Sequence, residues 1–383
     1  MACPQCPCSF TRSYRGGWDL AIRVLVVDDS ALMRIMVSKM LEEDADIEVV
    51  GTARNGLDAL TRIGKLDPDV VTMDIEMPEL DGLSALKRIM NECPRPVIML
   101  SSLTTAGADA TVDALRHGAF DFLAKPGVRA GDLSGVAGEL VAKVKLAART
   151  SVRRLQGTPI QRTAGPPGLS RSAGTSQTRK VTQLVAIGTS TGGPRALDAV
   201  LSSLPKTMPC PILIVQHMPP KFTLSLARRL DGSCAIHVVE AQHHQVLENG
   251  TAYIAPGDFH MAVSGRDGQY RIILNQDPKR HEHRPSVDVL FESLALLPNI
   301  ARHLVLMTGM GNDGAVGMMK AKKAGASTIA ESEHTSVVYG MPKAAVELGC
   351  VDHIVPLPRI GQELLSLIQD TTQSSMKNGQ SDI

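Results

Sequence analysis

The sequence predicts two α/β domains, each built on a doubly wound parallel sheet, with a linker between them. Short apolar runs alternate with amphipathic stretches over residues 22–145 and again over residues 181–369. Strands separated by helices in this way form parallel sheets whose two faces are covered. A chain of 383 residues is long enough for two such cores.

The first region predicts a flavodoxin-like domain over residues 22–145. Its apolar runs indicate strands at Arg23–Val27, Ile47–Ala53, Val70–Met73, Val97–Leu100 and Phe120–Ala124. Helical patterns lie between these runs, for example at Ala31–Glu42 and Gly82–Asn91.

The second region predicts another doubly wound domain over residues 181–369. Strands are expected at Leu184–Ile187, Pro211–Gln216, Ile236–Val239, Thr251–Ile254, His303–Met307 and Thr328–Ala330, with Arg271–Leu274 as part of a hairpin. Helices are expected to start near Pro194, Phe222, Val287, Gly314 and Pro342. Pro194 and Pro342 suit the first turn of a helix. Proline has no backbone N–H group, but in the first turn that group would have no partner within the helix.

Three segments are expected to lie outside the two cores. They are an N-terminal extension (1–21), a basic linker (146–180) and a polar C-terminal tail (370–383). From residue 151 to 180 the chain holds Arg and Lys but no acidic residue, amid Gly, Pro, Ser and Thr, a composition that cannot bury enough apolar surface to fold. Cys3, Cys6 and Cys8 in the extension are more typical of an unstructured leader than of a metal site, because a fourth ligand is missing.

Composition narrows the class of protein. The formal net charge of +1 argues against bulk nucleic-acid binding. No apolar run approaches the roughly 20 residues that a membrane span needs. The first residues also lack the pattern of a signal peptide. We therefore expect a cytoplasmic protein that is not bound to a membrane.

Polar residues follow the strands of the first domain at one edge of its sheet. Asp28 and Asp29 follow the first strand, Asp74 the third, Ser101 the fourth and Lys125 the fifth. Ligands bind at this edge in doubly wound folds. Carboxylates gathered there predict a Mg²⁺ site, and the cation would neutralise charge as Asp74 accepts a phosphoryl group, with Lys125 and Ser101 contacting its oxygens. The alternative is that the Asp residues merely cap the following helices.

The second domain carries a candidate nucleophile. Ser190 lies in Gly188–Pro194, between an apolar strand and a helical pattern. A sharp strand-to-helix turn exposes a hydroxyl next to a helix N-terminus. His217 and Asp313 follow two other strands and would supply the base and the orienting acid. The glycine-rich loop 308–314 could supply backbone N–H groups to an oxyanion.

Other readings of these residues remain open. The Ser190 loop is similar to a degraded dinucleotide fingerprint, and also to the nucleophile elbow of α/β-hydrolases, whose acid precedes the histidine. Alternatively, the role of Asp313 could be to cap the helix that starts at Gly314, which is compatible with a role as the acid. A metal at His281 and His283 is a weak alternative, because a third ligand is lacking. The alternative bases are His243, His244, His260, His281, His283 and His303.

The first domain resembles the response-regulator receiver family. The resemblance rests on Val26–Ser30, Met73–Gly82, Ser101–Ser102 and Asp121–Pro126. It implies phosphorylation at Asp74 and Mg²⁺ held by Asp28, Asp29 and the carbonyl of Glu76. It also implies that Ser101 and Phe122 move on phosphorylation.

The second domain resembles the family of chemotaxis protein-glutamate methylesterases, CheB. The motifs are Gly188–Pro194, Gln216–Pro220, Ala255–Met261, His283–Asp288, Met307–Ala315 and Val337–Pro342. The resemblance implies a Ser190–His217–Asp313 triad, with the backbone N–H of Met310 as an oxyanion donor. It also implies a phosphorylation-activated enzyme that demethylates glutamates, and deamidates selected glutamines, on the cytoplasmic helices of chemoreceptors. The histidine kinase CheA would be its phosphodonor, and the esterase step would need no cofactor.

A linker would let the first domain cover the Ser190 cleft until phosphorylation frees it. Two rival classes are a response regulator whose second domain only binds a partner or DNA, and an α/β-hydrolase for small esters. Nothing in residues 181–369 resembles a helix-turn-helix, and the order of the triad disfavours the second class.

Overall fold

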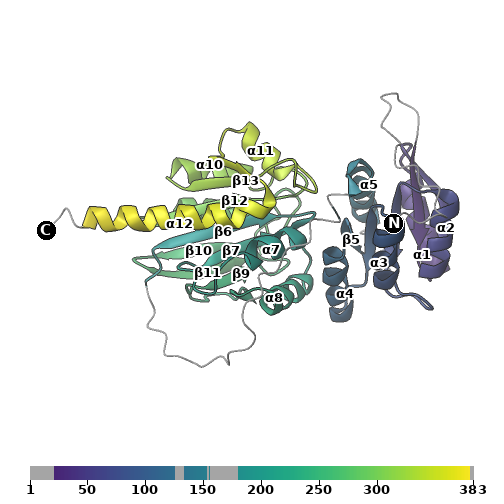
Figure 1. Ribbon diagram of the computed structural model, residues 1–383, viewed down its shortest axis with the longest axis horizontal. Helices are drawn as coiled ribbons and strands as arrows, with labels where there is room; N and C mark the ends of the chain where they lie inside the picture. The colour runs from purple at the N-terminus through teal and green to yellow at the C-terminus, as the bar shows by residue number, and fades with distance from the viewer. Residues whose placement is uncertain (1–20, 126–132, 153–154, 156–179, 380–383) are drawn as a thin grey trace. The chain divides into compact units, whose positions relative to one another are not determined.

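The structure is a computed structural model that describes residues 21–125, 133–152, 155 and 180–379. The chain divides into two compact units near residue 157 (Figure 1). Residues 1–20, with Cys3, Cys6 and Cys8, and residues 156–179 of the expected linker lie outside the described residues. Among the residues that are described, no helix is both long and apolar enough to cross a membrane.

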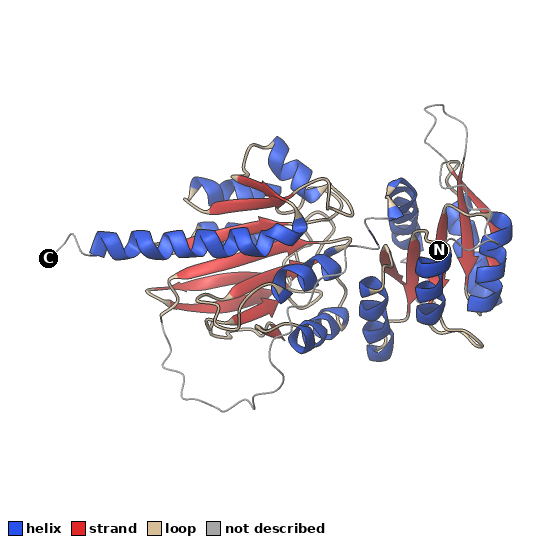
Figure 2. Cartoon of the chain, in the orientation of Figure 1, coloured by secondary structure: helices blue, strands red, loops and turns tan. Residues whose placement is uncertain are grey.

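The first unit is a five-stranded parallel sheet in the order β2-β1-β3-β4-β5, which confirms the flavodoxin-like prediction. Helix α1 packs with α5, while α2, α3 and α4 pack in succession, so helices cover both faces (Figure 2). The elements are β1 (Ile22–Val27), α1 (Ala31–Glu42), β2 (Ile47–Ala53), α2 (Gly56–Leu66), β3 (Val70–Asp74), α3 (Gly82–Glu92), β4 (Val97–Ser101), α4 (Thr105–Arg116), β5 (Asp121–Ala124) and α5 (Leu133–Arg149).

Helix α5 continues past the domain boundary expected at residue 145. Its last turn reaches Arg149, and Val144 and Ala147 are both fully buried. The apolar stripe of the helix therefore extends into the segment that was assigned to the linker. The basic, glycine- and proline-rich composition begins only at residue 151.

The second unit is a seven-stranded parallel sheet in the order β14-β13-β12-β6-β7-β9-β8. Helices α9 and α10 pack together, and α9 contacts β6 and β7; α12, α7 and α8 pack in succession (Figure 1). The elements are β6 (Gln183–Thr189), α7 (Gly193–Ser202), β7 (Ile212–Gln216), α8 (Phe222–Ser233), β8 (His237–Glu240), β9 (Thr251–Ile254), β10 (His260–Arg266), β11 (Gln269–Asn275), α9 (Val287–Ala295), β12 (Ala301–Leu306), α10 (Ala315–Lys323), β13 (Ser327–Glu331), α11 (Met341–Glu347), β14 (His353–Val355) and α12 (Leu357–Gly379).

The predicted hairpin exists as the antiparallel pair β10 and β11. Two features differ from expectation. The short edge strand β14 was not predicted, because its three residues are too few to show a period. Helix α12 runs to Gly379, so residues 370–379 are helical although a frayed tail was expected after Asp370. Polar composition alone does not end a helix whose earlier turns, at Ile360, Leu364 and Ile368, are anchored in the core.

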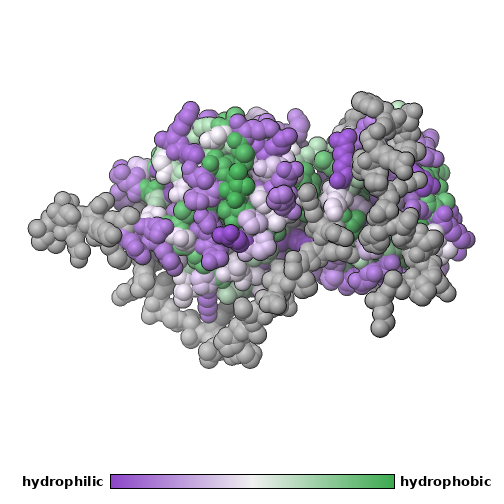
Figure 3. Space-filling model, turned by 45° about the horizontal axis from the view of Figure 1, so that its top comes forward, coloured by the Kyte–Doolittle hydropathy of each residue, from purple (hydrophilic) through white to green (hydrophobic). Residues whose placement is uncertain are grey.

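The order of the second sheet fixes where its chemistry lies. Strand β6 has β7 on one side and β12 on the other, so the chain reverses its direction of winding beside β6. The loops after β6, β7 and β12 therefore leave neighbouring strands at the same edge of the sheet. The face of the second unit that is visible in Figure 3 is mostly hydrophilic, with an apolar band across it.

Candidate active site and receiver pocket

Ser190 lies in a tight turn between β6 and α7. Its N–H donates to the carbonyl of Thr308 (3.0 Å), and its own carbonyl accepts from the N–H of Gly193 (2.8 Å). Gly192 has φ of 80°, a left-handed conformation that favours glycine. The turn therefore joins the loop after β6 to the loop after β12, and it leaves the Ser190 residue partly exposed.

The strand beside β6 brings His217 to this turn. The N–H of His217 donates to the carbonyl of Thr189 (3.2 Å), and Nε2 of Gln216 donates to the carbonyl of Ser190 (3.0 Å). The sequence motif contains Gln216 but gave no sign of this role, because a glutamine amide has no local signature.

His217 and Asp313 form a buried pair. Nε2 of His217 lies 2.8 Å from Oδ2 of Asp313, and the two side chains are 5% and 1% exposed. Because a carboxylate only accepts hydrogen bonds, Nε2 carries the proton and Nδ1 holds the lone pair. Nδ1 is buried and has no hydrogen-bond partner among the described residues. The arrangement leaves this nitrogen available as a base.

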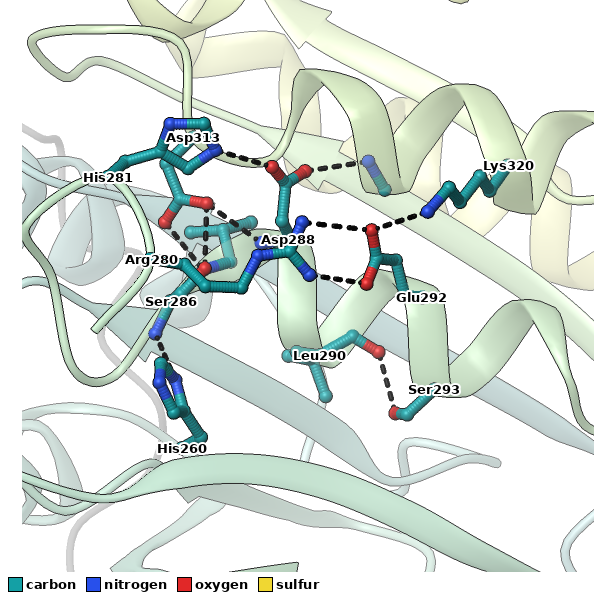
Figure 4. Close-up of polar contacts among 12 residues, drawn as sticks. His260, Arg280, His281, Ser286, Asp288, Leu290, Glu292, Ser293, Asp313 and Lys320 are labelled. Carbon is teal, nitrogen blue, oxygen red and sulfur yellow. Dashed lines mark hydrogen bonds and ion pairs between the residues drawn. The ribbon is translucent and has the colours of Figure 1, made fainter. Parts of the chain in front are cut away.

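The carboxylate of Asp313 is held by the N-terminus of α9. Oδ1 accepts from the hydroxyl of Ser286 (2.8 Å) and the N–H of Asp288 (3.0 Å), and Oδ2 accepts from the N–H of Val287 (2.7 Å) (Figure 4). The alternative in which Asp313 caps the helix from Gly314 is wrong: Gly314 is the N-cap of α10 and makes no side-chain cap. The acid caps α9 instead, a helix 25 residues earlier in the chain.

These contacts decide the charge of Asp313. Burial by itself would raise the pKa of the carboxyl. The hydrogen bond and charge of His217, together with the N–H groups of Asp288 and Val287, outweigh burial and hold the pKa well below its usual range. Asp313 is therefore an anion at neutral pH.

The loop after β12 approaches Ser190 closely. A Cβ on Gly309 would lie 2.9 Å from Cβ of Ser190, so only glycine fits there. The N–H of Gly309 donates to the carbonyl of Val338 (3.0 Å) and is not free to bind an oxyanion. The next residue, Met310, is the oxyanion donor that the sequence predicts, and that assignment stays a prediction.

The other histidines take part in other contacts. His281 pairs with Asp288 (2.9 Å), and Nδ1 of His260 accepts from the N–H of Ser286 (3.2 Å). His303 bonds Gln183, and burial lowers the pKa of His303 to about 4. His243 lies against His244 and accepts from the N–H of Leu274. His281 and His283 contact different partners: the ring of His283 stacks on that of His217, while ligand atoms of His281, Asp288 and Asp313 lie within 4.8 Å of one another.

Polar residues also converge at the edge of the first sheet. Side-chain oxygens of Asp28, Asp29 and Asp74 lie within 4.8 Å of one another. Nζ of Lys125 lies 2.8 Å from both Asp28 and Asp74. The Asp residues do not cap the following helices, since Ser30 caps α1 and Asp81 caps α3. Clustered hard oxygens are the ligands that Mg²⁺ prefers, so the residues present fit that ion.

Burial raises the pKa of Asp74, and the charge of Asp28 raises it further, while the hydrogen bond and charge of Lys125 oppose this. The carboxylate at the predicted phosphorylation site is thus held close to the negative charge of Asp28. A bound cation or a phosphoryl group that recruits Lys125 would relieve this repulsion.

The predicted switch residues lie on neighbouring strands. The Ser101 hydroxyl donates to the carbonyl of Gly107 (3.2 Å) and accepts from Thr111 (2.7 Å). Phe122 is 6% exposed. Sequence reasoning missed Lys143, whose Nζ lies 2.6 Å from the carbonyl of Phe122 and 5.4 Å from its ring centroid. From the sequence alone, a lysine on a helix that contacts the protein cannot be told from one whose side chain is solvated.

Fold and site together define a class of protein: a response-regulator receiver followed by a hydrolase domain built on a parallel sheet. Residues 185–364 match the family model of the CheB methylesterase, and residues 24–133 that of the response regulator receiver domain. A protein-glutamate methylesterase/protein-glutamine glutaminase of Geobacillus kaustophilus is 49% identical over 349 residues, which cover 91% of this chain and 99% of the relative. The protein of the same name from Thermotoga maritima is 43% identical over 353 residues, with the same two coverages.

Two solved structures match one unit each. The CheB methylesterase catalytic domain of Thermotoga maritima is 42% identical and covers 48% of this chain and 98% of that one, with a TM-score of 0.47. The response regulator domain of Thermotoga maritima CheB is 49% identical and covers 34% and 98%, with a TM-score of 0.32. On the full-length relatives and the family models, the chain belongs to the CheB family of protein-glutamate methylesterases with a receiver domain.

The contacts of Asp313 predict an effect of Ser286→Ala. A carboxyl with a lowered pKa contributes stability above its unfolded pKa, and this stability is lost as the pH falls through its folded pKa. Losing the Ser286 donor raises the folded pKa, so acid unfolding of the second unit should move to higher pH, and stability at neutral pH should fall by about 1.5–3 kcal/mol. Denaturant unfolding as a function of pH measures both, with exposed Ser264→Ala as the control. Equal acid midpoints for the two variants would contradict the account.

The electrostatics of Asp74 predict that Asp74→Asn stabilises the first unit in the absence of Mg²⁺. A carboxyl with a raised pKa contributes stability at low pH that is lost as the pH rises through its folded pKa. At neutral pH the charge of Asp74 therefore destabilises the unit, and its removal should raise Tm by roughly 3 °C. Calorimetry of the full chain checks this against Asp109→Asn, at an exposed position. A lower Tm for Asp74→Asn would show that the attraction to Lys125 dominates.

Proposed function

We propose that this protein removes methyl esters from glutamate side chains of chemoreceptors, and deamidates selected glutamines, by a Ser190–His217–Asp313 mechanism. The observation that carries the proposal is the 2.8 Å pair of His217 and Asp313 at the turn that holds Ser190. The names of the relatives, protein-glutamate methylesterase/protein-glutamine glutaminase, supply the substrate class. The outcome would be adaptation in chemotaxis-type signalling.

In the first step Oγ of Ser190 attacks the γ-carbonyl carbon of the methyl ester. Nδ1 of His217 takes the hydroxyl proton, and the anionic Asp313 stabilises the imidazolium that forms. Negative charge then develops on the carbonyl oxygen. The N–H of Met310 and the N-terminus of α7 are the groups proposed to stabilise it.

In the second step the tetrahedral intermediate collapses and the C–O bond to methoxide breaks. His217 returns its proton to this group, which leaves as methanol. A water molecule, deprotonated by His217, then attacks the acyl-enzyme and releases glutamate and Ser190. A glutamine side chain would form the same acyl-enzyme with loss of ammonia, which explains how one site serves both reactions.

The receiver is proposed to control this chemistry through phosphorylation of Asp74, with the histidine kinase CheA as phosphodonor. Mg²⁺, held by Asp28, Asp29, Asp74 and the Glu76 carbonyl, would neutralise the charge of the incoming phosphoryl group. Lys125, which contacts Asp28 and Asp74 through one ammonium, would follow the phosphoryl oxygens. The Ser101 hydroxyl would leave Gly107 and Thr111 to do the same, and Phe122 would move with it.

Substitution of the nucleophile tests the chemistry. Ser190→Ala should lower kcat for methanol release from methylated receptor membranes at least about 10³-fold, because no acyl-enzyme forms. Ser264→Ala, at an exposed position, is the matched control and should retain full activity. Near wild-type activity of Ser190→Ala would refute the triad.

Regulation is tested by a small-molecule phosphodonor. Methanol release by the wild-type chain should rise when the phosphodonor and Mg²⁺ are added together, and Asp74→Asn should keep the basal rate but lose the response. If the receiver inhibits by covering the cleft, a fragment of residues 180–383 should exceed the unphosphorylated chain. A response that survives Asp74→Asn would place phosphorylation elsewhere, and equal rates of fragment and chain would exclude inhibition by the receiver.

A further inference from the structure

We propose that His283 is a positioning residue for the catalytic base: its ring fixes the plane of His217, so that Nδ1 faces Ser190 while Nε2 stays on Asp313. The inference rests on the proposed function, because it concerns the same base. It assigns to His283 a role that neither the triad nor the oxyanion loop includes.

The first observation is the geometry of the two rings. The centroids of His217 and His283 lie 3.9 Å apart and the ring planes differ by 19°, so the rings are stacked. The hydrogen bond from Nε2 to Asp313 holds one ring nitrogen at 2.8 Å. One hydrogen bond alone leaves the His217 ring free to tilt about that contact, and such a tilt would move Nδ1. A flat ring packed on its face removes this freedom.

The second observation is that the segment carrying His283 is anchored at several points. This segment, residues 276–286, is called the strap here and joins β11 to α9 (Figure 4). Arg280 forms a bidentate ion pair with Glu292 on α9 (2.5 and 3.1 Å), and Lys320 on α10 contacts the same carboxylate (2.8 Å). Bidentate arginine–carboxylate pairs fix geometry as well as distance.

Two further pairs hold the strap on either side of His283. His281 contacts Asp288 on α9 (2.9 Å), and the guanidinium of Arg284 contacts Asp258 (2.7 and 3.0 Å). The Asp288 carboxylate is itself fixed by the N–H of Gly317 (2.6 Å). The strap is therefore tied directly to α9 and to the loop after β9, and its two partners on α9, Glu292 and Asp288, are in turn held by α10.

Backbone hydrogen bonds form a tight turn in the strap that ends at His283. The N–H of His283 donates to the carbonyl of Arg280 (2.8 Å), and the N–H of Arg280 donates to the carbonyl of His283 (3.1 Å). Between them His281 and Glu282 have φ of 50° and 64°, a left-handed conformation that non-glycine residues rarely adopt. A tight turn of this kind fixes the backbone from which the His283 side chain projects.

Two other roles for His283 fit the contacts less well. A metal shared with His281 does not fit, because His281 bonds Asp288 while His283 lies on His217. A role as the catalytic base does not fit either, because the buried acid pairs with His217. The stacking on His217 is the contact that links the ring of His283 to the catalytic base.

The test compares two substitutions in the full-length protein, assayed by methanol release from methylated receptor membranes. His283→Ala removes the stacked ring and should lower kcat about 10-fold with KM within about 2-fold, since misplacing a catalytic group costs rate rather than substrate binding. His283→Phe restores a flat ring and should recover kcat to within about 3-fold of wild type. Lys279→Gln, an exposed position on the strap, is the control and should leave kcat and KM unchanged.

Imidazole ¹⁵N NMR of His217 supplies a readout that a purely structural role would not move. We expect the Nε2-protonated tautomer in all three proteins, because the bond to Asp313 sets it, and broadened His217 ring signals only in His283→Ala, where the ring can tilt. Wild-type kcat in a folded His283→Ala, or His283→Phe as slow as His283→Ala, would overturn the proposal. If Ser190→Ala also kept its activity, the proposed function itself would fail. If Ser190→Ala were inactive, only the role of His283 would fall.

Discussion

The second unit depends on how one buried carboxylate is paired. Asp313 is 1% exposed, and burying an unpaired charge costs several kcal/mol. Its oxygens accept from His217, the Ser286 hydroxyl and the N–H groups of Val287 and Asp288. These donors come from β7 and the start of α9, so satisfying one charge aligns the loops after β7, β11 and β12. The base is oriented by the same contacts that make the acid stable.

The two units treat their carboxylates in opposite ways. Asp313 accepts hydrogen bonds from four donors, which match the lone-pair sites of a carboxylate, and its pKa is held far below the usual range. Asp74 shares one ammonium with Asp28, and burial raises its pKa. The first arrangement suits a permanent anion behind a histidine. The second suits a carboxylate whose repulsion by Asp28 is relieved when a cation and a phosphoryl group bind.

The sheet explains why the chain order of the triad differs from its order in space. Strands β12, β6 and β7 are neighbours in the sheet. The loops that follow them, which carry Asp313, Ser190 and His217, therefore lie side by side at one edge, although 96 residues separate the histidine from the acid. An α/β-hydrolase with the order serine, acid, histidine would need a different winding. The order Ser190, His217, Asp313 arises because β6 and β7 precede β12 in the chain, which returns to the other side of β6 to form β12.

The sequence by itself determined most of the strands, the two doubly wound units and the residues at their strand ends, because period, strand-end position and motif spacing are local properties. Strand-end position pointed to Ser190, Asp313 and the acidic pocket around Asp74, whereas the choice of His217 among several histidines came from the family resemblance. Only the tertiary structure decided that Asp313 caps α9 rather than α10, that His283 lies on His217 rather than beside His281, and that Lys143 reaches Phe122. These contacts join segments that are far apart in the chain, and their geometry is set by packing, which no local pattern records.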